Sequence, residues 1–184
     1  MYIYYNYINN KNGDDMYYIN NFFLYSFVGF ILETIIQFII KSKVNSGILY
    51  GPWTIVYGFG VIIILLLEKL VFSKKNYNKW VKRIFLFLSV AICLTLIELL
   101  GGILIEKIFH KTFWNYSKFK FNIGKYISLE ISIIWTVLSI IFVYILKPLT
   151  DKIIKKIPNL ITYILIILMV IDFTFTLINK IRLQ

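Results

Sequence analysis

Five long apolar stretches constrain this chain more than any other feature. About 20 consecutive apolar residues in a helix can cross the hydrocarbon core of a bilayer. Hydrophobic residues make up 59% of the 184 residues, and the mean hydropathy of +0.76 is far above that of a soluble domain. The sequence therefore predicts an all-α, polytopic membrane bundle in one transmembrane domain, residues 1–184. After a polar N-terminal segment, 1–21, we expect spans at about 22–40, 52–72, 84–105, 127–146 and 160–178.

The net charge of +11 would suggest a nucleic-acid partner in a soluble protein. Here the lysines flank the spans, as in 74–79 and 152–156, which is typical of headgroup contact and topology control. We therefore expect membrane lipid, and no nucleic acid, as a partner, and a multi-pass protein of the cell membrane. The loop cations divide almost evenly between the two faces, so they do not fix the orientation.

Six acidic residues lie inside or at the ends of the apolar stretches. An ionisable group at this depth costs a few kcal/mol unless it is paired, neutralised or hydrated. One of them, Glu68, is followed by Lys69 and is interpreted as a solvated helix end. The other five lie toward the face whose loops are rich in Gly, Pro, Asn and aromatic residues, and such loops favour a fixed backbone path. They are Glu33, Glu98, Glu106, Glu130 and Asp172.

Each of these features has a structural and a functional interpretation. Glu33 and Glu98 either hydrogen-bond between helices as protonated carboxyls or contact a polar substrate or cation. Gly101 and Gly102, on the same face of the third span as Glu98, indicate tight helix packing. Tryptophan and tyrosine near span ends are typical of an aromatic belt; they are Trp53, Trp114, Tyr116 and Trp135.

The sequence predicts neither an enzyme nor a cofactor. Glu106 and His110 are one helical turn apart, but the chain has one His and one Cys, so we expect no metal site. A lone Ser or Cys without a neighbouring base gives no catalytic nucleophile.

Three motifs carry a family resemblance over about residues 22–145. They are Gly47-Ile-Leu-Tyr-Gly51-Pro52-Trp53 with Tyr57 to Gly60, Glu98 to Ser117 with Gly101-Gly102 and Trp114-Asn115-Tyr116-Ser117, and Phe121-Asn122-Ile-Gly124 with Ser128-Leu129. In this order they resemble the small bacterial membrane proteins named "Putative ABC-transporter permease, type IV". In two places the chain departs from the family pattern. Asn115 replaces an aspartate, and Glu130 stands where a proline or small residue is expected, so a charge-dependent role of either position does not carry over.

The resemblance implies a permease subunit. The chain lacks the Gly-x-x-x-x-Gly-Lys-Ser/Thr phosphate loop, so a separate ATP-binding subunit is the implied partner. The predicted substrate site contains Glu33, Glu98, Glu106, Trp114, Asn115, Tyr116, Trp53 and Tyr57.

Two alternatives stay open: a non-transporting membrane scaffold or sensor, and a proton- or cation-coupled small transporter. Five helices are few for a substrate pathway, so either transport interpretation predicts a homo-oligomer.

Overall fold

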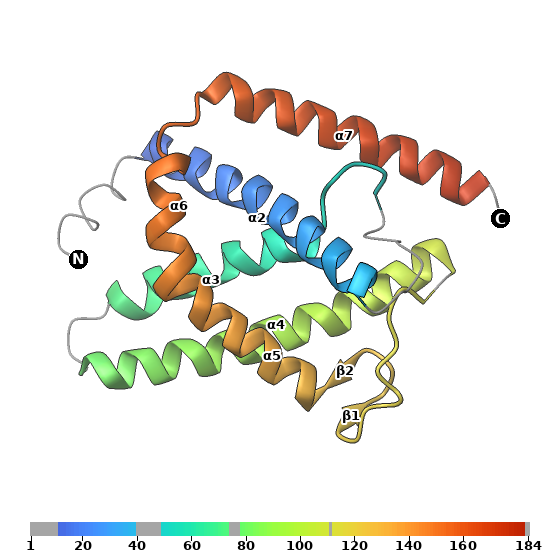
Figure 1. Ribbon diagram of the computed structural model, residues 1–184, viewed down its shortest axis with the longest axis horizontal. Helices are drawn as coiled ribbons and strands as arrows, with labels where there is room; N and C mark the ends of the chain where they lie inside the picture. Colours follow the sequence, from blue (N-terminus) through green and yellow to red (C-terminus); the bar gives the residue numbers. More distant parts are fainter. Residues whose placement is uncertain (1–10, 40–48, 74–77, 111, 183–184) are drawn as a thin grey trace. The chain divides into compact units, whose positions relative to one another are not determined.

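The computed structural model describes residues 11–39, 49–73, 78–110 and 112–182. The described chain is almost entirely helical, with one short hairpin (Figure 1). Its elements are α2 (Lys11–Ile39), α3 (Ile55–Ser73), α4 (Lys79–Phe109), β1 (Asn122–Ile123), β2 (Ile127–Ser128), α5 (Leu129–Ile141), the π-helix η1 (Phe142–Leu146), α6 (Lys147–Ile154) and α7 (Asn159–Arg182).

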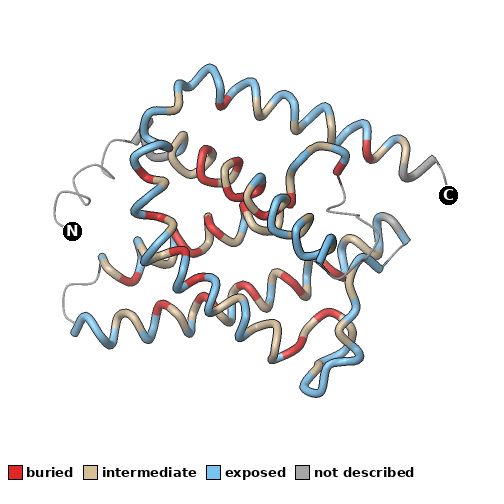
Figure 2. Tube along the Cα trace, viewed as in Figure 1, coloured by how far each residue is buried: buried red, intermediate tan, exposed pale blue. Residues whose placement is uncertain are grey.

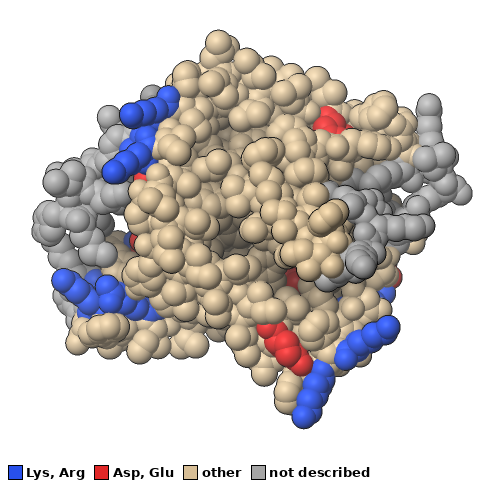
Figure 3. Space-filling model, viewed as in Figure 1, with Lys and Arg blue, Asp and Glu red and all other residues tan. Residues whose placement is uncertain are grey.

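Five helical segments are long and apolar enough to cross a membrane, which confirms the predicted fold class. They are Asp15–Ile39, Ile55–Ser73, Lys79–Ile108, Leu129–Ile154 and Asn159–Asn179. Exposed residues run along all of them (Figure 2), and many are large and apolar. Charged side chains occupy only a few spots on the face shown in Figure 3. Such a surface suits lipid, because the helices satisfy their own backbone hydrogen bonds and present apolar side chains outward.

The first helix begins earlier than predicted. It starts at Lys11 rather than at residue 22, and Asn20 and Asn21 are buried within it. The Asn21 amide donates to the backbone oxygen of Tyr17 at 2.8 Å, and Asn20 accepts from Thr162 of α7 at 2.6 Å. Hydropathy assigned these asparagines to a polar N-terminal segment. In the structure they are part of α2 and make hydrogen bonds within the helix and to α7. Residues 1–10 of that segment lie outside the described residues.

The fourth span extends beyond its predicted end at residue 146. α5 continues through η1 into α6 and passes Pro148, whose ring nitrogen cannot donate a hydrogen bond. At this point the Lys147 N–H bonds to the Phe142 oxygen, five residues earlier. The wider π-turn accommodates the proline and lets the helix continue to Ile154.

The chain divides into two compact units. The terminal unit contains residues 1–62 and 148–184, and the central unit contains residues 63–147. Each unit has its own internal contacts. The single transmembrane domain stays a prediction.

Polar contacts join the helices of the terminal unit. Tyr17 and Tyr25 of α2 bond to the side chains of Asp151 and Thr150 in α6, at 2.7 and 2.8 Å. The N–H of Thr54, just before α3, donates to the Ser26 oxygen of α2 at 2.9 Å. Where lipid surrounds the helices, hydrogen bonds of this kind and close packing hold them together.

In the central unit, α4 packs against α5 with Leu86 and Val90 of α4 buried. Thr95 and Ser132 bond across the two helices at 2.8 Å. Glu68 forms an ion pair with Lys147, and their side chains are only 21% and 10% exposed. The interpretation of Glu68 as a solvated helix end was therefore wrong, because the carboxylate is largely buried and ion-paired. The sequence did not indicate this pair because Lys147 lies 79 residues away.

Candidate functional site

Each unit contains an acidic side chain on a membrane-spanning helix that receives hydrogen bonds from a loop. In the terminal unit the acid is Asp172 of α7, and the loop is residues 49–54, which we name the strap. The N–H groups of Tyr50 and Gly51 donate to Asp172 at 3.1 and 2.8 Å. The Trp53 indole N–H donates at 2.8 Å, and Thr176 adds a fourth bond at 3.2 Å. Both carboxylate oxygens of Asp172 are therefore used.

The strap depends on a close approach at Gly51. A β-carbon at this position would overlap the Trp53 indole and lie 2.8 Å from Asp172 Oδ2. Tyr50 also packs edge-on against Phe175 of α7, with ring centroids 5.6 Å apart. The glycine, the tryptophan and the acid thus form one fastening between the strap and α7.

The terminal unit holds three of the predicted site residues. Trp53 is a donor to Asp172, and the ring of Tyr57 lies against Gly29 of α2. Glu33 is on α2, one turn after Gly29, and is partly buried. Asp172 was among the acids singled out but was omitted from the predicted site. Its three donors in the strap are about 120 residues distant in sequence, so no local pattern could indicate them.

In the central unit the corresponding acid is Glu98 of α4, which is only 6% exposed. The Tyr116 hydroxyl donates to Glu98 Oε1 at 2.7 Å. The indole of Trp135 in α5 is a second polar group acting on this carboxyl. Oε2 is buried and has no hydrogen-bond partner of ordinary geometry within the described part of the chain.

The loop that carries Tyr116, residues 112–128, is named the hairpin loop. It is fastened to α4 at Glu106, which accepts from the Lys125 ammonium and the Tyr126 hydroxyl, while Thr112 donates at 3.3 Å. The bond to Glu106 raises the pKa of Lys125, so this ammonium stays charged through neutral pH.

Tyr126 is the buried anchor of the hairpin loop. It is 5% exposed, and its ring lies against Gly102, where a β-carbon would come within 2.5 Å of Tyr126 Cδ1. Trp114 packs edge-on against Tyr126, with ring centroids 6.0 Å apart. The Trp114 indole N–H is buried and has no acceptor among the described residues.

The other end of the hairpin loop is fastened to α5. β1 and β2 pair antiparallel, Asn122 opposite Ser128, around Gly124 with φ of 66°. Glu130 accepts from the Phe121 N–H at 3.1 Å. The Ser128 hydroxyl caps α5 by accepting from Ile131 N–H at 3.2 Å. Glu130, which replaces an expected proline or small residue, thus holds the hairpin to the start of the next helix.

The apolar side chains of Phe113, Trp114, Phe119 and Phe121 predict that the loop at 107–126 folds back over the bundle and that these side chains are covered. The hydrogen bonds of the hairpin loop to Glu98 and Glu106 confirm its return onto α4. The prediction that its phenylalanines are covered was wrong, because Phe113, Phe119 and Phe121 are 40%, 39% and 55% exposed. Contacts with α4 involve Tyr116, Lys125 and Tyr126, and leave the phenylalanines outside. Asn115 is exposed and accepts from the Ser117 N–H at 2.9 Å, so it shapes a turn.

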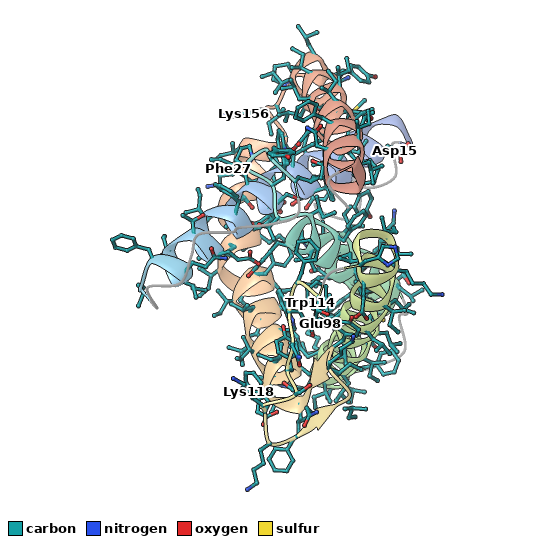
Figure 4. All side chains as sticks on the ribbon, turned by 90° about the vertical axis from the view of Figure 1, so that its right-hand side faces the viewer. Asp15, Phe27, Glu98, Trp114, Lys118 and Lys156 are labelled. Carbon is teal, nitrogen blue, oxygen red and sulfur yellow. The ribbon has the colours of Figure 1, made fainter. Side chains whose placement is uncertain are left out.

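The structure therefore brings together four of the predicted site residues in the central unit. Glu98 bonds to Tyr116, and Glu106 is joined to Trp114 through Tyr126. Figure 4 shows Glu98 and Trp114 toward the inside of this unit and Lys118 toward its outer end. One site shared with Glu33, Trp53 and Tyr57 stays a prediction. Among the described residues, no three His, Cys, Asp or Glu side chains are grouped to hold a metal ion.

A family model described as "Putative ABC-transporter type IV" matches residues 20–177, which include all or most of each of the five apolar helices. No curated protein and no solved structure matches the chain.

Proposed function

The chain belongs to the family described as "Putative ABC-transporter type IV", and from this membership we propose that it is the membrane-spanning permease subunit of an ATP-driven transporter. Its five apolar helices make it a multi-pass membrane protein. In this proposal ATP is hydrolysed by a separate ATP-binding subunit, the kind of partner that the family suggests. The proposed location is the bacterial cell membrane, in a homo-oligomer of permease subunits.

The proposed substrate contact is Glu98, with Tyr116 and Trp114 beside it. The observation that carries this proposal is Glu98 Oε2, an oxygen of a side chain that is 6% exposed, which has no hydrogen-bond partner of ordinary geometry among the described residues. A buried polar atom without a partner costs about 1–3 kcal/mol, and more if it is charged, so its retention favours a role in binding. A cation or a hydrogen-bond donor on the substrate would satisfy Glu98 Oε2, and an acceptor would satisfy the Trp114 N–H.

The remaining predicted residues have supporting parts in this proposal. Glu106 and Trp53 act through the loops that they fasten, and Asn115 acts through a turn of the hairpin loop. Glu33 and Tyr57 are proposed as contacts from the terminal unit. Because Tyr116 lies on the hairpin loop and bonds to Glu98, substrate arriving from that side would require this bond to open.

The test is reconstitution of the purified chain with the ATP-binding subunit encoded nearest to its gene. We expect the chain to raise the ATPase rate of that subunit in proteoliposomes, and the Glu98→Gln variant to assemble equally but to stimulate less. If the chain is correctly inserted and the ATPase rate of the subunit does not change, the permease proposal is contradicted and the interpretation as a membrane scaffold or sensor is favoured. Collapse of an imposed pH gradient by the chain alone, without ATP, would favour the proton-coupled transporter.

A further inference from the structure

The hairpin loop lies at a membrane boundary by its connections. It follows α4, which ends at Phe109, and precedes α5, which begins at Leu129, and both helices are membrane spans. Its two ends are fastened at Glu106 and Glu130. The loop is therefore held close to the span ends, where the headgroups of a bilayer lie.

Four large apolar side chains of this loop are exposed, and we call them, together with the lysines between them, its exposed face. Phe113, Phe119 and Phe121 are 40%, 39% and 55% exposed, and Ile123 at the hairpin tip is 74% exposed. This face is not part of the Glu98 contact, which uses Tyr116. Four large apolar side chains on so short a loop form a surface that water does not favour.

The charge on this face has one sign. Lys118 and Lys120 are exposed between the phenylalanines, and residues 112–124 contain no Asp or Glu. The Lys120 ammonium lies 5.4 Å from the centre of the Phe121 ring. The two neighbouring acids of the span ends, Glu106 and Glu130, are used to fasten the loop. The exposed face therefore carries positive charge that no acid within the same stretch neutralises.

We propose that this face, Phe113, Lys118, Phe119, Lys120, Phe121 and Ile123, enters the bilayer interface and that its two lysines bind anionic lipid headgroups. Aromatic rings and lysines are the residues that occupy this depth, with the rings in the acyl boundary and the ammonium groups at the phosphates. The absence of acids in 112–124 matches the negative charge of the headgroups. The hairpin loop is then fixed on two sides, by Glu106 of its own chain and by lipid.

The depth of the exposed face in the bilayer is tested in proteoliposomes, with a fluorescent NBD label on Ile123→Cys in a Cys93→Ala background. We expect strong quenching by lipids that carry a doxyl group near the headgroup, weaker quenching by doxyl near the chain end, and little by aqueous iodide. Val137→Cys, on an exposed part of α5 farther along the span, is the control and should show the reverse preference between the two doxyl positions.

The binding of the two lysines to anionic headgroups is tested with the same label, in vesicles that contain an increasing fraction of phosphatidylglycerol. The blue shift of the label should grow with the anionic fraction, and Lys118→Gln with Lys120→Gln should remove at least half of that growth. Lys152→Gln with Lys156→Gln, exposed lysines outside the loop, removes the same charge and should leave the growth intact.

Strong iodide quenching at Ile123 would overturn the proposal, since the face would then lie in water. Shielding from both iodide and lipid would overturn it too, since another copy of the chain would then cover the face. Lipid quenching with no dependence on the two lysines would overturn the headgroup assignment.

Discussion

Asp172 and Glu98 make an informative pair, because each is an acid on a membrane-spanning helix that a loop meets. Asp172 accepts four hydrogen bonds, from the strap and from Thr176, and both of its oxygens are used. Glu98 accepts one hydrogen bond of ordinary geometry, from Tyr116, with the Trp135 indole as a second polar group near the carboxyl, and its Oε2 has no partner of ordinary geometry in the described residues. The two acids cannot be told apart by sequence position, but they differ in how completely their partners satisfy them.

This difference separates a structural acid from a candidate binding acid. In a low-dielectric environment each unsatisfied polar atom is costly, and a fully bonded carboxylate is a strong fastening. Asp172 is satisfied by its own chain and leaves no capacity for a ligand. Glu98 keeps capacity for one more partner. The number of hydrogen-bond donors around an acid therefore indicates its role better than its presence in a membrane span does.

The largest effect is expected from Asp172→Ala. The substitution leaves the N–H groups of Tyr50, Gly51 and Trp53 without their acceptor, and we expect it to lower the free energy of unfolding by about 3 kcal/mol or more. The measurement is unfolding by SDS titration in mixed micelles. Asp172→Asn keeps one acceptor oxygen and should cost about half as much. An alanine variant as stable as the wild type would show that the strap is not held by this acid.

A smaller effect, about 2 kcal/mol, is expected from Gly102→Ala, because overpacking against Tyr126 forces the ring to move. This change disturbs the hairpin loop without altering either acid. Gly101→Ala is the matched control, since apart from its chain neighbours and the backbone of its own helix no heavy atom of the described chain lies within 4 Å of the added β-carbon, and its unfolding free energy should stay close to the wild type. Equal losses in the two variants would mean that Tyr126 does not anchor the loop.

The sequence predicted the five helices because apolar composition over 20 residues is a local signal. It also predicted ordered loops around Gly51 and Trp114, from turn-forming and aromatic residues. It could not predict the partners of Asp172, of Asn20 or of Lys147, which lie 79 to 142 residues away. These contacts depend on how helices pair, and hydropathy carries no information about pairing.

The hairpin loop shows the same limit at shorter range. Its apolar composition predicted that Phe113, Trp114, Phe119 and Phe121 are covered, but the three phenylalanines are exposed and Trp114 is only partly buried. The buried aromatic residue of the loop is Tyr126. Apolar character alone does not distinguish a side chain covered by protein from one covered by lipid. The loop's attachment was missed in part because Tyr126 and Lys125 were not recognised as partners of Glu106.

Glu98→Gln tests the functional side of the comparison. The glutamine oxygen can still accept from Tyr116, so we expect a change in unfolding free energy of less than about 1 kcal/mol. Stimulated ATPase activity with the partner subunit should fall about tenfold, equivalent to about 1.4 kcal/mol. A stable variant with full activity would leave Glu98 without a role in transport. A loss of stability as large as that of Asp172→Ala would make the two acids equivalent.

The smallest expected effect is that of Tyr116→Phe, about 1 kcal/mol in unfolding free energy, because the loop stays fastened through Tyr126 while one hydrogen bond is lost. The variant also tests the chemical reactivity of the Glu98 carboxyl group. With its donor from the loop removed, the carboxyl should react faster with an apolar carbodiimide, measured by mass spectrometry of the labelled peptide. Trp53→Phe is the matched change at Asp172, where three other donors remain, so labelling of Asp172 should stay slow. If both acids became equally reactive, the number of donors would not be what distinguishes them, and the assignment of Glu98 as the binding acid would lose its basis.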